Sequence, residues 1–152
     1  MRRKISHETM KQEFYSLPLL LDQVILKKEH PGCSLVQSVA QQLHMILTTS
    51  FGEFQPNESF GCAIWDLDFD NITSAHKLKE FIRQSLLKSI QEHERRLENV
   101  RVELVVRQEQ LVAAAASPIV KKGMEITITG LLRFTNERFI YTDSFFVGPL
   151  SY

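Results

Sequence analysis

The stretch SAHKLKEFIRQSLLKSIQEHERRLENVRVELVVR, residues 74–107, changes its hydrophobic period along its length. In its first part, apolar residues recur every three or four positions, which is typical of a helix with one buried face. The residues on that face are Leu78, Phe81, Ile82, Leu86, Leu87 and Ile90. From Val100 onward, apolar and more polar residues alternate, which predicts a half-buried strand. We therefore predict a long helix over residues 74–97 and a strand over residues 100–107.

Elements of the same two kinds flank this stretch. Residues 35–49 have the apolar spacing of a second helix, for which Ser34 is a suitable N-cap. Residues 124–132 alternate as a second strand, and we expect a third in the aromatic stretch 139–147. Helices that precede antiparallel strands indicate an α+β fold, with N-terminal amphipathic helices followed by a small antiparallel β-sheet.

The rest of the chain is expected to be less regular. Gly and Pro interrupt residues 50–73, and we expect a loop over residues 113–122. Residues 17–26 form a compact apolar group that suits a short helix or strand and is too short to span a bilayer. We expect residues 1–33 to be an N-terminal extension and residues 34–152 to be one domain.

Composition limits the classes of function. The 152 residues suffice for one core, and the 18 basic and 18 acidic residues give a net charge of zero. No overall positive field recruits nucleic acid or an anionic membrane, so neither is expected as a partner. The two cysteines, Cys33 and Cys62, form no CxxC motif, and we interpret them as packing residues of a cytoplasmic protein.

The common catalytic and metal-binding motifs are absent from the sequence. His93-Glu94 does not continue as HExxH, because Leu97 stands where the second histidine is required. The alternating aspartates of residues 66–70 begin like a calcium loop, but Asn71 replaces the glycine that makes its turn. GxSxG, GxGxxG and P-loop motifs do not occur either. We expect no metal site and no cofactor.

The junction between the long helix and the following strand combines a carboxylate with two guanidinium groups. If the helix continued, Glu94 and Arg96 would point in different directions and could not meet. If the chain leaves the helix at about His93 and runs extended, both side chains project to the same side and can pair. In the simplest interpretation, Arg95 and Arg96 complement the helix dipole and Glu94 makes a surface pair. The alternative is a contact point for a partner protein, since a guanidinium suits carboxylates and carbonyls.

A catalytic interpretation of Glu94 also remains open. Glycoside hydrolysis needs two carboxylates that face one cleft, and Glu94 with Asp66 or Asp68 would provide them. No spacing in the sequence singles out that pair. A small lysozyme-like hydrolase is therefore an alternative to a binding protein.

The junction resembles a known signature. Residues 90–97, followed by the alternating residues 100–104, are similar to the Glu-Pro-Arg-Leu signature and following strand of the contractile-tail baseplate wedge family, whose type VI secretion member is TssE. Glu94, Arg96 and Leu97 match the signature, and Arg95 replaces its proline. Phe60-Gly61, with Asp66 downstream, is similar to another segment of that family. The resemblance covers residues 34–147.

This resemblance implies a non-enzymatic structural subunit with a fold related to a contractile-sheath domain. It would join baseplate wedge proteins to the first sheath ring, in a cytoplasmic baseplate held at the inner membrane. The sheath would add strands to an exposed sheet edge, which either residues 100–107 or residues 124–132 could offer. The expected partner-binding residues are Glu94, Arg95, Arg96, Leu97, Val102, Leu104, Ile126 and Ile128. A secretion system, a phage-like tail and a stand-alone regulator that sequesters a protein all remain open.

Overall fold

A computed structural model of the chain describes residues 14–65, 75–111 and 119–146. The chain divides into two compact units, Met1–Gln41 and Gln42–Tyr152. Each unit is described by itself below. The expected boundary between residues 33 and 34 is a prediction that this division does not test.

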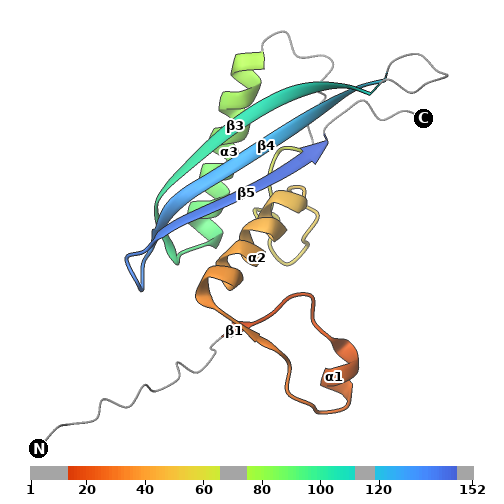
Figure 1. Cartoon of the computed structure of the whole chain (residues 1–152), viewed down its shortest axis with the longest axis vertical. Coiled ribbons are helices and arrows are strands. Elements are labelled where there is room, and N and C mark those ends of the chain that lie inside the picture. The colour runs from red at the N-terminus through yellow and green to blue at the C-terminus, as the bar shows by residue number, and fades with distance from the viewer. Residues whose placement is uncertain (1–13, 66–74, 112–118, 147–152) are drawn as a thin grey trace, which may run out of the picture. The chain divides into compact units, whose positions relative to one another are not determined.

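The first unit contains a small antiparallel pair of strands. β1 (Phe14–Tyr15) pairs with β2 (Gly32–Cys33), and the short helix α1 (Leu21–Ile25) lies in the segment between them (Figure 1). The apolar group expected at residues 17–26 therefore contains a short helix. None of the α1 residues is buried.

Helix α2 (Leu35–Thr48) begins with the N-cap that the sequence predicts. The Ser34 Oγ accepts a hydrogen bond from the Gln37 backbone N–H at 3.2 Å, and the Gln37 Oε1 accepts one from the Ser34 N–H at 3.1 Å. This reciprocal arrangement is a capping box, and it satisfies two backbone donors that the helix start would leave unpaired. The predicted helix over residues 35–49 is confirmed.

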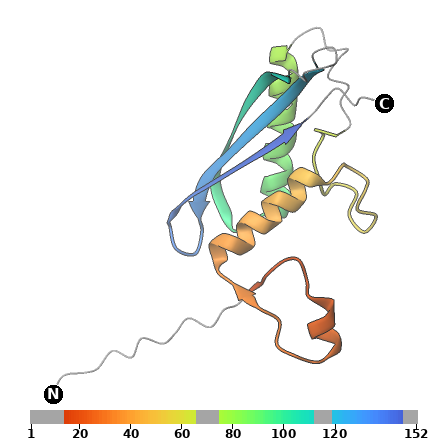
Figure 2. The ribbon, with the colours of Figure 1, turned by 45° about the vertical axis from the view of Figure 1, so that its right-hand side comes forward.

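The second unit is built on a three-stranded antiparallel sheet in the order β3-β4-β5. The strands are β3 (Leu97–Leu111), β4 (Ile119–Leu132) and β5 (Arg138–Phe146), and the helix α3 (Ala75–His93) precedes them. Both ribbon views show α3 running along one face of the sheet (Figures 1 and 2). The predicted α+β class and the three predicted strands are confirmed. The loop expected over residues 113–122 is shorter, because β4 begins at Ile119.

The core of this unit lies where α3 meets the sheet. Ile82, Leu86 and Ile90 of α3 are at most 1% exposed, and Ile126 and Ile128 of β4 are fully buried. Phe81 was predicted to share the buried face of the helix, and that prediction is wrong, because its side chain is 55% exposed. Phe81 is adjacent to Ile82, and the helix turns about 100° per residue, so the two side chains leave on different faces.

Neither cysteine forms a disulfide and both are buried, in agreement with their interpretation as packing residues. Across the residues that the structure describes, no helix is long and apolar enough to span a bilayer.

Candidate functional site: the turn after α3 and the edges of the sheet

Helix α3 ends at His93, where the sequence analysis placed one possible exit. The Glu94 N–H still donates to the Ile90 carbonyl at 2.8 Å, and the Leu97 N–H donates to the Glu94 carbonyl at 3.3 Å. Residues 94–97 therefore form a tight four-residue turn. The predicted extended exit is wrong in this respect, because the chain reverses within one turn and enters β3 at Leu97.

The turn brings the Glu94 carboxylate and the Arg96 guanidinium together. The Arg96 backbone N–H and Nε donate to the Glu94 Oε1 at 2.9 and 2.8 Å, and the Arg96 Nη2 donates to Oε2. The guanidinium thus grips both carboxylate oxygens in a fork, which gives geometric specificity as well as energy. Of the alternatives left open by the sequence, the one in which the two side chains pair holds.

Burial makes this pair a structural element. The Glu94 side chain is 2% exposed and that of Arg96 is 23% exposed. Removing one member of a buried ion pair leaves the other charge uncompensated in a low-dielectric environment, which costs about 3–5 kcal/mol. Glu94 therefore fixes the exit of α3, and its carboxylate is enclosed rather than offered to a partner.

Arg95 has the opposite character. Its side chain is exposed, and no hydrogen bond or ion pair holds it within the described part of the chain. It lines an open depression of about 460 Å³ beside the start of β3. Arg133, another member of the lining, is already paired with Glu98 at 2.7 Å. The Arg95 guanidinium is therefore the cation of this depression that can pair with a group from outside the chain.

The strand residues expected to bind a partner lie in the core. Val102 is 4% exposed, Leu104 is partly buried, and Ile126 and Ile128 are fully buried. In addition, β4 pairs with β3 on one side and with β5 on the other. The expectation that residues 124–132 could offer a free edge is therefore corrected, because the edge strands of this sheet are β3 and β5.

The two edge strands differ in chemistry. On the exposed face of the sheet, β3 presents the charged residues Arg101, Glu103 and Arg107. On the same face β5 presents Arg138 at its first position and then no charge from Ile140 to Phe146, and these last two residues are 57% and 66% exposed. Charges on an edge strand oppose pairing with another chain, whereas an uncharged stretch such as residues 140–146 of the outer face permits it. The sequence analysis expected this third strand but did not assign a partner to its edge, because strand order is not visible in the local pattern.

Comparison with protein families identifies the family of this chain. Residues 33–137 match the family of the baseplate wedge protein gp25. The chain belongs to this gp25 family. The matched region includes the turn at residues 94–97 and most of the three-stranded sheet, so the resemblance seen in the sequence is confirmed.

Two solved structures are similar to this gp25-family chain. A "putative tail lysozyme" from Geobacter sulfurreducens is 23% identical, with a TM-score of 0.55, over 81% of this chain and all of that one. This likeness shows the fold alone. A chain of the baseplate complex of the type VI secretion system is 16% identical, with a TM-score of 0.46, over 84% of this chain and 97% of that one. No curated protein matches significantly.

The Phe60-Gly61 segment of this gp25-family chain has a steric explanation. Gly61 has a φ of +122°, and a Cβ atom at this position would lie 2.5 Å from the Thr49 carbonyl oxygen. Only glycine tolerates this backbone conformation and this approach without strain. The segment therefore closes the loop after α2, where the adjacent Cys62 pairs with Ser50 through an isolated parallel β-bridge of the backbone.

A polar cluster on the inner side of β5 was also missed by the sequence analysis. The His44 Nδ1 lies 2.9 Å from the Asp143 Oδ2, and the Tyr141 hydroxyl donates to the same oxygen at 2.7 Å. Burial raises the pKa of Asp143, but hydrogen bonds from Tyr141 and His44 outweigh it and lower the pKa overall. Burial, followed by the hydrogen bond to Asp143, raises the pKa of Tyr141. The cluster connects His44 of α2 to β5 on the face of β5 that is opposite the exposed residues of this strand.

The structure also bears on the hydrolase alternative. A general acid must present a protonated carboxyl to a substrate cleft. Glu94 instead accepts its hydrogen bonds from Arg96 and is buried. Asp66 and Asp68, the suggested second carboxylates, lie outside the described residues.

Proposed function

We propose that this chain is a non-enzymatic structural subunit of a contractile injection baseplate of the type VI secretion kind. It joins the wedge proteins to the first ring of sheath subunits, on the cytoplasmic side, in a baseplate held at the inner membrane. Membership of the gp25 family carries this proposal. The enclosed Glu94 supports a structural role over a lysozyme-like one.

The contact with wedge proteins is assigned to the turn at residues 94–97. The buried pair of Glu94 and Arg96 holds the turn in shape, and Arg95 projects from it without a hydrogen bond or ion pair to the described residues. A guanidinium forms specific, charge-assisted hydrogen bonds with carboxylates and carbonyls. We therefore assign recognition to Arg95 and positioning to Glu94 and Arg96.

The contact with the sheath is assigned to the outer edge of β5. Strand addition uses main-chain hydrogen bonds for affinity and alternate side chains for selectivity. The outer face of β5 presents Ile140, Thr142, Ser144 and Phe146, which an added strand could cover without burying a charge. On β3, an added strand would have to pack beside Arg101, Glu103 and Arg107.

Affinity purification from the native cell tests both assignments. The Arg95→Glu variant should lose the wedge proteins, whereas Arg83→Ala, a change at an exposed ion pair on α3, should retain them. The Ile140→Lys variant on β5 should lose the sheath, whereas Val105→Lys, a matched change on β3, should retain it. Val105 is 46% exposed and Ile140 57% exposed, and the side chains of Arg95 and Arg83 also reach the surface. Circular dichroism should therefore show all four variants folded.

The outcomes distinguish the proposal from its alternatives. Recovery of neither wedge nor sheath proteins by the wild type would refute the baseplate role. A single small partner in their place would support the sequestering regulator. Turnover of cell-wall glycan that is lost in Glu94→Gln would support the hydrolase.

A further inference from the structure

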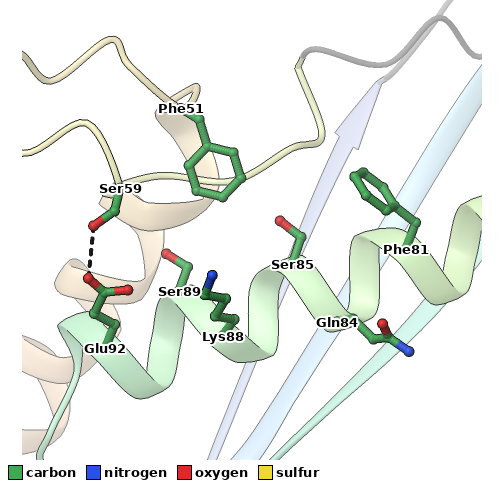
Figure 3. A pocket seen from close by; sticks show the side chains of 8 residues that line it. All are labelled: Phe51, Ser59, Phe81, Gln84, Ser85, Lys88, Ser89 and Glu92. Atoms are coloured by element: carbon green, nitrogen blue, oxygen red, sulfur yellow. Dashed lines mark hydrogen bonds between the residues drawn. The ribbon is translucent and has the colours of Figure 1, made fainter.

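An open groove of about 330 Å³ lies between α3 and the loop that follows α2. Figure 3 shows its lining, with one wall made by the side chains of α3 and the other by the loop. The groove is distinct from the turn at residues 94–97 and from both sheet edges. Its lining residues are Phe51, Ser59, Phe81, Gln84, Ser85, Lys88, Ser89 and Glu92.

The α3 wall contains two hydroxyl groups that the fold does not use. The Oγ atoms of Ser85 and Ser89 are buried and have no hydrogen-bond partner in the part of the chain that the structure describes, and Ser89 is 3% exposed. Both hydroxyls point from the helix toward the side on which Phe51 lies (Figure 3). Buried polar groups without partners are rare in folded proteins because they lose their hydration without compensation. These hydroxyls are suited to acceptors supplied from outside the chain.

The rim of the groove carries two exposed aromatic side chains and two charged ones, Lys88 and Glu92. Phe51 and Phe81 are 40% and 55% exposed, although aromatic side chains of this size normally gain from burial. The Glu92 carboxylate accepts a hydrogen bond from the Ser59 hydroxyl at 2.9 Å. Lys88 makes no hydrogen bond or ion pair within the described residues. The groove therefore combines exposed aromatic side chains, two hydroxyls without acceptors among the described residues, a lysine without an ion pair among them, and the Glu92 carboxylate.

We infer that this groove docks an extended segment of a baseplate wedge protein. A large apolar side chain of that segment packs between Phe51 and Phe81, its backbone carbonyls accept from Ser85 and Ser89, and its carboxylate pairs with Lys88. The inference rests on the proposed function for the class of partner. The chemistry of the groove comes from this chain alone.

The spacing of the hydroxyls favours an extended partner. Ser85 and Ser89 are one helical repeat of four residues apart, which is an axial rise of about 6 Å. Carbonyls two residues apart on one side of an extended strand are separated by about 6.6 Å. One strand laid along α3 can therefore reach both hydroxyls with equivalent carbonyls. Lys88 favours a carboxylate of the segment at its own position, whereas Glu92, four residues further along α3, disfavours a second one next to it.

Site-specific photo-cross-linking in the assembled complex tests this inference. A cross-linker at Phe81 should capture one defined segment of a wedge protein that carries an acidic residue, whereas a cross-linker at Arg83 should not. The variant Lys88→Glu should then weaken binding of that wedge protein about tenfold or more. Replacement of the identified acidic residue by lysine should restore the affinity of Lys88→Glu.

The double variant Ser85→Ala, Ser89→Ala separates docking from folding. Because both hydroxyls are unpaired in the free chain, their removal should leave its thermal stability equal or higher. The same variant should bind the wedge protein more weakly. A lower melting temperature would mean that the hydroxyls serve the fold, and the inference would be wrong.

The failures of the two proposals differ. If the wild type recovers no wedge protein, both the baseplate role and the groove inference fail. If the wild type recovers wedge proteins, and Lys88→Glu and the double serine variant bind them with the same affinity as the wild type, the groove inference alone fails. Cross-links from Phe81 only to this chain, or to a second copy of it, also overturn the groove inference.

Discussion

Helix α3 carries one glutamate–arginine pair on its surface and leads into another in the core. In the exposed pair, the Arg83 Nε and Nη2 donate to the two carboxylate oxygens of Glu80 at 2.9 and 2.6 Å. In the buried pair, Arg96 grips both oxygens of Glu94 in the same way. The Glu80 and Arg83 side chains are 40% and 41% exposed, whereas Glu94 is 2% exposed.

The comparison shows that hydrogen-bond geometry alone does not decide how much an ion pair contributes to the stability of the fold. Water and salt screen the exposed pair, and either side chain can be solvated without the other. In the buried pair, neither water nor another described side chain replaces a missing partner for Glu94. The pair of Glu80 and Arg83 therefore lies on the surface of α3 and contributes little to stability. The pair of Glu94 and Arg96 determines how the chain leaves α3.

The largest predicted effect is that of Arg96→Ala. This change leaves the Glu94 charge buried and unpaired, and we expect the free energy of unfolding to fall by about 3–5 kcal/mol. Urea denaturation of the isolated chain measures it. A loss below about 1 kcal/mol, as for a surface pair, would contradict the structural role of the buried pair. Because Arg96→Ala affects the fold, Arg95→Glu is the better probe of assembly.

Arg96→Lys should have an intermediate effect. The lysine keeps the positive charge but lacks the planar fork that reaches both oxygens of Glu94. We expect a loss of about 1.5–3 kcal/mol, the contribution of hydrogen bonds to a charged group. The same urea denaturation measures it. A loss equal to that of Arg96→Ala would show that the fork, and not the charge, accounts for the whole effect.

Arg95→Pro should have a smaller effect of opposite sign. Arg95 occupies the second position of the turn at residues 94–97, where proline is favoured, and its φ is not positive. We expect a gain of about 0.4–1 kcal/mol, because proline restricts the unfolded chain. Thermal unfolding measures the gain, and a clear decrease in stability would show that the turn requires the Arg95 N–H.

The smallest effect is expected for Arg83→Ala. Hydrogen bonds, first from Arg83 and then from Gln84, lower the pKa of Glu80 from 4.5 to about 2. A lowered pKa stabilises the fold above the ordinary value, and that contribution is lost as the pH falls from about 4.5 to about 2. Since the pair is exposed, we expect no measurable change in unfolding at neutral pH.

NMR titration of the Glu80 carboxyl provides the positive readout for Arg83→Ala. In this variant the pKa of Glu80 should return toward 4.5. A pKa that stays near 2 in the variant would show that Gln84, which also donates to Glu80, is the main cause of the shift.

The local elements of the fold were predictable from the sequence. The change of period predicted α3 and β3, although α3 ends at His93 instead of residue 97 and β3 begins at Leu97 instead of residue 100. Ser34 marked the start of α2. The pairing of Glu94 with Arg96 was predictable as one of two alternatives. Their tight turn was not, because the sequence does not show how sharply a helix exit bends.

The functional surfaces were less predictable because they depend on contacts between distant residues. The alternating pattern of residues 124–132 is the same for a central strand as for an edge strand, so Ile126 and Ile128 were assigned to a partner. The register with β5 shows that they belong to the core. Likewise, His44 and Asp143 are 99 residues apart, and no local signal connects them.

Hydrogen exchange of the assembled chain tests the central claim most directly. Backbone amide exchange would be measured for the chain in complex with wedge proteins, before and after addition of sheath subunits. The account predicts that amides of β5, Arg138–Phe146, become protected when the sheath is added, while protection of the β3 edge is unchanged. Protection of β3 alone, or of neither edge, would contradict the assignment of β5 as the strand that the sheath extends.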